Sequence, residues 1–180
     1  MKYLRKCLDI ILTLKKRGKV LDVGCGEGKL SKFFYERGFK VVAIDKSQKV
    51  IDSIKKQFGN KIKVKRKDVE NLSLRENYDI IIAKNILHLL SNKGKAIEVI
   101  KNLQAHTNKN GIHLIVGPTT KDHSYREEKF FIKPKEMKNI YREWKCLFCK
   151  TFFTDLEKHD GFPPHRHNLF IGLFVKFVKK

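Results

Sequence analysis

The apolar residues of this chain fall into short continuous runs separated by segments with helical spacing. Four runs, at residues 20–23, 41–44, 78–83 and 112–117, are apolar almost throughout, which is typical of parallel strands buried on both faces. Strands that alternate with helices predict an α/β fold with a mainly parallel sheet. The helical segments are residues 2–16, 30–37, 50–58 and 92–107, with a further short helix from Pro134.

A fifth strand is predicted at residues 61–66, where the pattern is different. Ile62 and Val64 alternate with lysines, so this strand has one apolar face and one charged face. Because charged side chains discourage pairing with a further strand, the alternation favours the edge of the sheet.

The C-terminal part is predicted to add an antiparallel hairpin. Two β-like runs cover residues 144–153 and 168–178. The polar stretches 118–133 and 155–167 precede these runs, and irregular stretches of such length in a compact domain are usually functional or mobile. We expect both stretches to lie on the substrate side of a single domain over residues 1–180.

A glycine-rich loop joins the first strand to the next helix. Gly24, Gly26 and Gly28 follow Asp22 in a D-x-G-x-G-x-G pattern. Glycine permits unusual backbone angles and close approach to a ligand, and the following helix directs N–H groups toward the loop. The dinucleotide fingerprint does not fit, because it requires a small residue where Lys29 stands. The two interpretations left are a nucleotide-type cofactor loop and a plain tight turn.

Acidic residues stand at the ends of the second and third strands. Asp45 lies 17 residues after Gly28, where a carboxylate can accept hydrogen bonds from both ribose hydroxyls. Its alternative role is to cap the next helix, for which Ser47 is the better candidate. Asp68 follows the third strand, and its alternative is an ordinary solvated loop acid.

Polar and basic residues follow the strand predicted at 78–83, and others stand near the C-terminal hairpin. Lys84, Asn85 and His88 follow the strand at 78–83, where open α/β sheets bind ligands. Together with His165 and His167 of the stretch 155–167, Lys84, His88 and His123 could form a ring of basic groups that holds an oxyanion or takes up a proton. The alternatives are a structural role for His88 and a basic surface loop at 165–167. The candidate basic ring comprises Lys84, His88, His123, His165 and His167.

The cysteines raise the question of a metal site. Cys146 and Cys149 could bind zinc with His159, His165 or His167, but zinc sites usually contain two such cysteine pairs. Residues three apart on a strand point to opposite faces, so packing within a strand is favoured and no metal site is expected. The sparse, irregular cysteines indicate a reduced, cytoplasmic protein.

The amino-acid composition narrows the class of protein but says little about the chemistry that the protein performs. With 41% hydrophobic residues over 180 positions, the chain is globular, and no apolar run approaches the roughly 18 residues of a membrane span. The N-terminal region does not resemble a secretory signal. The net charge of +21 comes mostly from dispersed lysines. It is compatible with compositional bias, with an anionic small substrate and with RNA.

The glycine loop, Asp45, Asp68 and the order of strands resemble the class I S-adenosylmethionine-dependent methyltransferases. The resemblance implies a Rossmann-like α/β fold with a seven-stranded, mostly parallel sheet in the order 3-2-1-4-5-7-6. Strand 7 would be antiparallel, helices would cover both faces, and a helix at residues 1–17 would lie over the cofactor. The cofactor would be S-adenosyl-L-methionine and its product S-adenosyl-L-homocysteine.

The same resemblance implies how the cofactor would be held. The backbone of the glycine loop would approach its methionine end, and Asp22 would order the amino group. Asp45 would hold the ribose, and Asp68 the adenine amino group, with a backbone contact from Val69. The implied cofactor-binding residues are Asp22, Gly24, Cys25, Gly26, Asp45, Lys46, Asp68, Val69, Lys84 and Asn85.

The C-terminal part is similar to the tellurite-resistance branch of these methyltransferases. There a tryptophan, here Trp144, begins strand six, and a histidine–arginine motif precedes strand seven. Members methylate tellurium or selenium oxyanions, and some accept thiols, which implies a small-molecule acceptor here. The rivals are an RNA methyltransferase and a non-catalytic S-adenosylmethionine-binding regulator, and the oligomeric state is not indicated. The candidate catalytic residues are His88, His165, Arg166 and His167.

Overall fold

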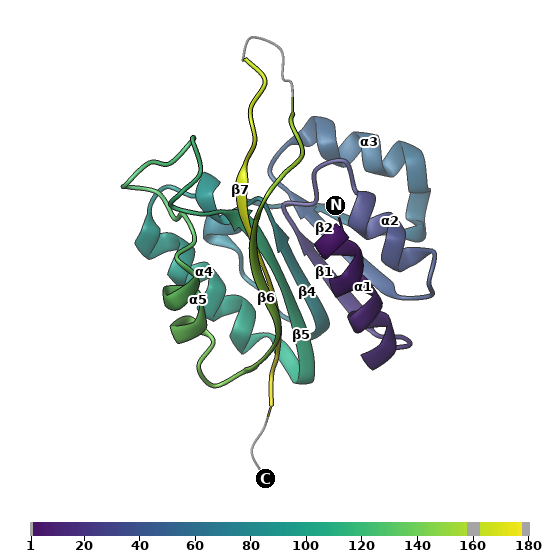
Figure 1. Ribbon diagram of the computed structural model, residues 1–180. Coiled ribbons are helices and arrows are strands. Elements are labelled where there is room, and N and C mark those ends of the chain that lie inside the picture. Colours follow the sequence, from purple (N-terminus) through teal and green to yellow (C-terminus); the bar gives the residue numbers. More distant parts are fainter. Residues whose placement is uncertain (1, 158–162, 178–180) are drawn as a thin grey trace.

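The computed structural model describes residues 2–157 and 163–177 and has three layers, a central sheet with helices on both faces (Figure 1). The seven strands follow the order β3-β2-β1-β4-β5-β7-β6. The first five are parallel, and β7 runs antiparallel to both β5 and β6. The predicted fold class and strand order are therefore confirmed. The strands are β1 Lys19–Val23, β2 Lys40–Asp45, β3 Lys63–Arg66, β4 Tyr78–Lys84, β5 Thr107–Pro118, β6 Lys145–Phe153 and β7 Asn168–Val175.

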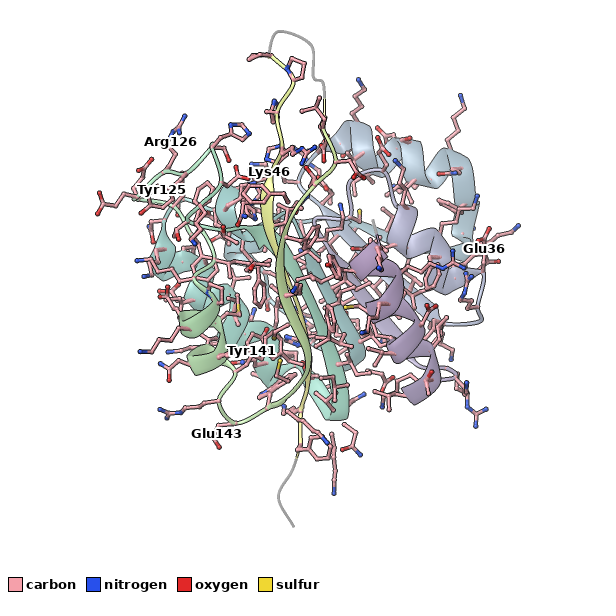
Figure 2. All side chains as sticks on the ribbon, in the orientation of Figure 1. Glu36, Lys46, Tyr125, Arg126, Tyr141 and Glu143 are labelled. Atoms are coloured by element: carbon pink, nitrogen blue, oxygen red, sulfur yellow. The ribbon has the colours of Figure 1, made fainter. Side chains whose placement is uncertain are left out.

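Helices α1 to α3 cover one face of the sheet, and α4 and α5 cover the other (Figure 1). Strand side chains alternate between two separate cores, so that Leu21 packs in one and Val20 in the other. This double burial explains the continuous apolar runs of the central strands. Figure 2 shows side chains filling the space on both sides of the sheet. The helices are α1 Lys2–Leu14, α2 Lys29–Tyr35, α3 Gln48–Phe58, α4 Lys93–Ala105 and α5 Pro134–Ile140, with short 3₁₀ turns at Gly59–Lys61, Val69–Asn71 and Leu87–Leu89.

Several predicted boundaries need correction: the helix expected at 2–16 ends at Leu14, and the strand expected at 168–178 ends at Val175. Two further differences concern β3 and β5. The third strand was expected to begin at Lys61, but residues 59–61 form a 3₁₀ turn and β3 begins at Lys63. The helix expected at 92–107 ends at Ala105, since Thr107 already pairs with Tyr78 and extends β5 toward its N-terminus.

The two cysteines of β6 were expected on opposite faces, and this expectation is wrong. The register shifts between Cys146 and Phe148, so Cys146 pairs with Phe174 and Cys149 with Gly172. Because those partners are two residues apart on β7, both cysteines lie on the same face. His159, one of the candidate zinc ligands, lies outside the described residues, as do Met1, the rest of 158–162 and residues 178–180.

The stretch 118–133 is anchored to the body of the protein. Thr119 and Ile132 form a bridge close to its two ends, and Phe130 and Phe131, which belong to the stretch, are buried. In the described part of the chain, no helix combines the length and the apolar character needed to cross a membrane.

Candidate functional site

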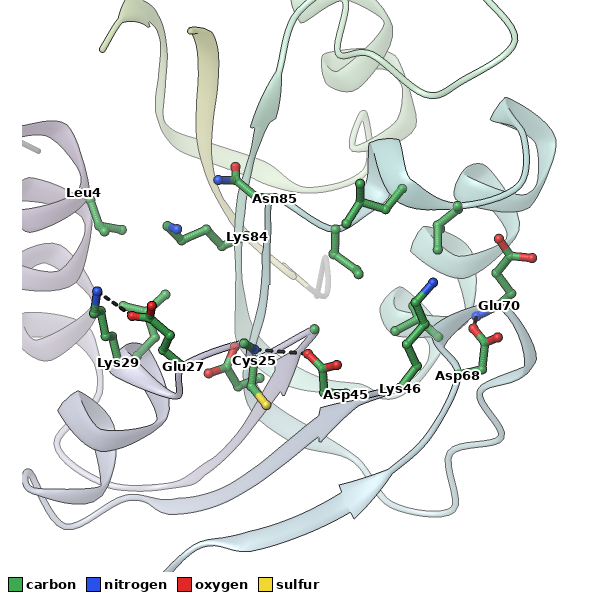
Figure 3. A pocket seen from close by; sticks show the side chains of 18 residues that line it. Leu4, Cys25, Glu27, Lys29, Asp45, Lys46, Asp68, Glu70, Lys84 and Asn85 are labelled. Carbon is green, nitrogen blue, oxygen red and sulfur yellow. Dashed lines mark hydrogen bonds and ion pairs between the residues drawn. The ribbon is translucent and has the colours of Figure 1, made fainter. Parts of the chain in front are cut away.

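A cavity of about 690 Å³ opens at the carboxyl ends of β1, β2 and β4 (Figure 3). The strand order reverses between β1 and β4, and this switch point is where open α/β sheets hold ligands. Leu4 of α1 also lines the cavity. The ten residues predicted to bind a cofactor all line it: Asp22, Gly24, Cys25, Gly26, Asp45, Lys46, Asp68, Val69, Lys84 and Asn85.

Two glycines of the loop have backbone angles that other residues adopt only with strain. Gly24 has φ 66° and Gly26 has φ 50°, both in the left-handed region. A Cβ at Gly24 would stand 2.8 Å from the side chain of Ile86, whereas one at Gly26 would meet no described atom within 4 Å. Gly26 therefore presents bare backbone to the cavity, as close approach by a ligand requires.

Asp22 lies buried in β1 beneath the loop and is held by α2. The Ser31 hydroxyl donates a hydrogen bond to its Oδ2 at 2.6 Å. Burial raises the pKa of Asp22 to about 6, against the opposing effects of Ser31 and of Lys84. Sequence analysis did not identify Ser31. The one feature that marks it is its complete burial in α2, which is unusual for a polar residue.

Asp45, at the end of β2, braces two backbone segments. Its Oδ2 accepts a hydrogen bond from Gly26 N–H at 3.1 Å, and its Oδ1 accepts one from Ser47 N–H at 2.9 Å. Ser47, not Asp45, caps α3 by accepting from Val50 N–H, as predicted. The carboxylate thus fixes the glycine loop and lines the cavity at once (Figure 3).

Asp68 stands at the far side of the cavity, after β3. Its Oδ1 accepts a hydrogen bond from Glu70 N–H at 3.0 Å and so caps the 3₁₀ turn that carries Val69. Figure 3 shows Lys46, Asp68 and Glu70 on one side of the cavity, and Leu4, Glu27 and Lys29 on the other.

The charge of the cavity differs from that of the whole chain. Lys29 pairs with Glu27 at 2.6 Å, so these two charges cancel each other. Among the other lining residues acidic groups outnumber lysines, so the net charge of the lining is negative in a protein of net charge +21. The lining contains five carboxyl groups, on Asp22, Glu27, Asp45, Asp68 and Glu70, and three ammonium groups, on Lys29, Lys46 and Lys84.

Cys25 is in the cavity but is not an activated nucleophile. Burial, reinforced by the carboxylates of Asp22 and Asp45, raises the pKa of its thiol to about 12. The side chain is therefore a neutral thiol at physiological pH. Asn85, at the end of β4, has φ 55°, and its N–H donates to the carbonyl of Val116 at 2.8 Å.

The four predicted catalytic residues, all in described segments, are not among those lining this cavity. His88 follows Ile86 and Leu87 at the end of β4, and its ring packs 5.9 Å from that of Phe131. Its buried Nδ1 has no hydrogen-bond partner among the described residues. Burial lowers its pKa, opposed by Asp122, so the ring is neutral at pH 7.

Three histidines of the predicted basic ring gather at the same edge of the sheet. The rings of His123, His165 and His167 have centroids 4.4 to 4.9 Å apart. Arg166 is exposed, and chain alternation directs its side chain away from those of its two neighbours. Lys84 stays in the cavity, and His88 lies close enough to His167 for the two to interact electrostatically.

Asp122 lies under this group, and sequence analysis assigned it no role. Its Oδ2 accepts hydrogen bonds from Asn168 N–H at 2.7 Å and from His167 Nδ1–H at 3.2 Å, while Ser124 N–H donates to Oδ1 at 3.0 Å. Burial acts to raise the pKa of Asp122, but these donors outweigh it and the pKa is lowered. The two loops are therefore joined through one buried carboxylate.

Comparison with known proteins identifies the relatives of this chain. The family described as tellurite resistance protein TehB matches residues 6–165. A probable S-adenosyl-L-methionine-dependent methyltransferase TehB of Haemophilus influenzae (strain 10810) is 29% identical over 147 residues, which cover 79% of this chain and 51% of the relative. The chain thus spans about half the length of the curated TehB relatives that it matches.

Solved structures agree with the family match. The crystal structure of TehB from Haemophilus influenzae aligns with TM-score 0.82 and 25% identity, over 96% of this chain and 62% of that one. The N-methyltransferase NodS from Bradyrhizobium japonicum, in complex with S-adenosyl-L-homocysteine, aligns with TM-score 0.77 over 97% of this chain and 86% of that one; at 13% identity it supports the fold alone. The chain therefore belongs to the family of the tellurite resistance protein TehB, a branch of the class I S-adenosylmethionine-dependent methyltransferases.

Proposed function

We propose that this chain binds S-adenosyl-L-methionine and transfers its methyl group to a small, soft nucleophile, with tellurium and selenium oxyanions as the first candidates. The observation that carries the proposal is the row of acidic residues at the ends of three adjacent strands. Asp22 in β1, Asp45 at the end of β2 and Asp68 after β3 border one cavity in that order.

The row extends across the cavity, from β1 to the segment that follows β3. Neighbouring strands lie about 4.8 Å apart, so β1 and β3 are separated by about 10 Å. In the proposed pose, Asp22 orders the amino group of the methionine end, Asp45 accepts from the ribose hydroxyls, and Asp68 accepts from the adenine amino group. The open backbone at Gly26 leaves room for the ligand to approach closely. The remaining proposed cofactor contacts are Gly24, Cys25, Lys46, Val69, Lys84 and Asn85.

The negative lining of the cavity supports the same ligand. S-adenosylmethionine carries a positive sulfonium and a positive amino group, and the cavity supplies five carboxyl groups against three lysines. A polyanionic nucleotide would be repelled by this lining. When bound, the sulfonium supplies an activated methyl group and its own leaving group, so the residues of this chain have to align the acceptor and exclude water.

The proposed acceptor side lies beyond β4, near the carboxyl end of β5 and the start of β7. His88 is neutral and has a buried nitrogen without a described partner. It can therefore take a proton or a hydrogen bond from the molecule that receives the methyl group. His165 and His167 would border the acceptor, and the exposed Arg166 would attract an anion to this edge. A soft nucleophile requires no strong base, which agrees with this set.

An RNA acceptor is the second candidate, favoured by the net charge of +21. To choose between acceptors, the protein is incubated with methyl-labelled S-adenosylmethionine and, separately, tellurite, selenite, a small thiol or RNA. Label in the headspace or in organic extracts is the expected result. Label in acid-precipitated RNA would replace the small-molecule proposal. Cofactor binding without transfer to any acceptor in the panel would favour a non-catalytic regulator.

A further inference from the structure

The histidine cluster joins His165 and His167, which the proposed function places beside the acceptor, to a third histidine, His123, which it does not use. His123 comes from the loop after β5, and His165 and His167 come from the segment that precedes β7. One ring nitrogen of each histidine can be selected such that all three nitrogens lie within 4.8 Å of one another. Three imidazoles that converge in this way form a set of metal ligands, provided that each presents a lone pair.

The hydrogen bonds of two of the rings determine where their lone pairs are. Nδ1 of His165 lies 2.9 Å from the carbonyl oxygen of Pro163, and Nδ1 of His167 lies 3.2 Å from Oδ2 of Asp122. A carbonyl and a carboxylate can only accept, so each Nδ1 carries the proton and each Nε2 carries the lone pair in the neutral ring. Metal-binding histidines are usually oriented in this way, by donating their second N–H to a carboxylate or carbonyl.

Asp122 adds fixed negative charge directly beneath the rings. Its side chain is fully buried and is held by backbone donors from Ser124 and Asn168. Its Oδ1 lies 4.0 Å from Nε2 of His123, so the carboxylate is close to a second member of the cluster. Buried negative charge at this position offsets the repulsion between a dication and the basic surface of the protein.

We propose that His123, His165 and His167 bind one divalent first-row metal ion, with Zn²⁺ as the best match for three imidazoles. Tetrahedral coordination at zinc–nitrogen distances of about 2.0–2.1 Å places the nitrogens about 3.3 Å apart. The nitrogens therefore have to approach one another, and His123 has room to move because its side chain is 46% exposed on a loop. Three protein ligands leave a fourth position for water or for an anionic oxygen or thiolate ligand.

The metal site is tested with the full chain, free of any polyhistidine tag and treated with chelator beforehand. Zn²⁺ is titrated by calorimetry, and Co²⁺ by visible absorption. One equivalent of Zn²⁺ is expected to bind, and Co²⁺ should give the intense visible bands of a tetrahedral site without a thiolate charge-transfer band. His123→Ala should weaken Zn²⁺ binding by more than about 100-fold, since even a residue that only orients a ligand contributes about 10–100-fold.

Two further variants make the result specific. His106→Ala removes a histidine that caps the end of α4, outside the cluster, and should leave Zn²⁺ affinity unchanged. Cys146→Ser with Cys149→Ser should also leave it unchanged. Absence of stoichiometric binding, or binding that survives His123→Ala, would overturn the proposal, and loss of binding only in the cysteine variant would assign the metal to β6. Circular dichroism of His123→Ala checks that the exposed substitution leaves the fold intact.

Discussion

Asp22 is the residue whose charge most directly links the cavity to the proposed cofactor. Its pKa in the free protein is raised to about 6, chiefly by burial, so it is mostly ionised at pH 7 and mostly protonated at pH 5. A protonated carboxyl group cannot attract the positive amino group proposed to lie beside it. Affinity for S-adenosylmethionine is therefore expected to be constant above about pH 7 and to fall roughly tenfold per pH unit well below pH 6. Calorimetric titrations from pH 5 to 8 measure this dependence.

A matched variant separates Asp22 from other groups that titrate in this range. Asp22→Asn keeps the size of the side chain and its ability to accept from Ser31, but it has no charge to lose. The variant should bind weakly at every pH in this range, with a much flatter profile. Wild-type affinity that stays flat from pH 5 to 7 would contradict the role assigned to Asp22.

At the scale of single residues, the sequence allowed us to place those that stand at or directly after the end of a strand. Asp45 and Asp68 are examples, because the apolar runs that precede them locate those ends. Ser31 and Asp122 could not be assigned in this way. Asp122 is held by the backbone of Asn168, 46 residues away, and a contact of that kind exists only after β5 and β7 have paired.

At the scale of elements, a buried histidine joins β5 to α4 and to the segment after α5. Tyr141 donates its hydroxyl proton to Nδ1 of His113 at 2.7 Å, while Nε2–H of His113 donates to Thr107 Oγ1 at 2.8 Å. The Thr107 hydroxyl in turn donates to the carbonyl of Leu103 at 2.6 Å. Figure 2 shows Tyr141 directed into the molecule and Glu143 directed outward. This chain of donors requires the neutral form of His113.

The neutral His113 predicts how stability depends on pH. Burial, assisted by Lys176, lowers its pKa from 6.5 to about 3 in the folded protein. Between these values the unfolded chain binds the proton and the folded chain does not, so stability falls as pH decreases. The contribution is complete above about pH 6.5 and is lost toward pH 3, with a magnitude on the order of a few kcal/mol. Urea unfolding at pH 7, 6, 5 and 4 measures the loss.

Comparison with a His113→Asn variant isolates this contribution from those of other groups. The variant should be less stable at pH 7, and its free energy of unfolding should change less between pH 7 and 4 than that of the wild type. Parallel pH profiles for the two proteins would show that His113 does not carry the effect.

Elements were predictable where burial alone determines the pattern. The apolar runs of β1, β2 and β4 follow from coverage on both faces, and the lysine alternation of β3 follows from its place at the edge. The register shift in β6 and the extension of β5 to Thr107 depend on the strands that they pair with. No local pattern of apolar residues specifies such pairing, which is why both were missed.

For the whole molecule, the distribution of charge is more informative than its total. Of the 19 acidic residues, five line one cavity, although lysine and arginine outnumber acids by 40 to 19 over the chain. A site that concentrates the scarcer charge is suited to a cationic ligand such as a sulfonium. Arg166, exposed at the proposed acceptor edge, carries a positive charge that suits an anionic acceptor.

The measurement that most directly tests the central claim is a calorimetric titration of S-adenosylmethionine into the wild type and into Asp45→Ala. The control is Asp52→Ala, which removes an exposed carboxylate of α3 that hydrogen-bonds to Gln48, outside the cavity lining. We predict one binding site in the wild type, unchanged in the control. Asp45→Ala should bind at least about 100-fold more weakly, because charge-assisted hydrogen bonds contribute about 1.5–3 kcal/mol each. Absence of binding by the wild type, or equal affinity in Asp45→Ala, would contradict the assignment of this cavity to the cofactor.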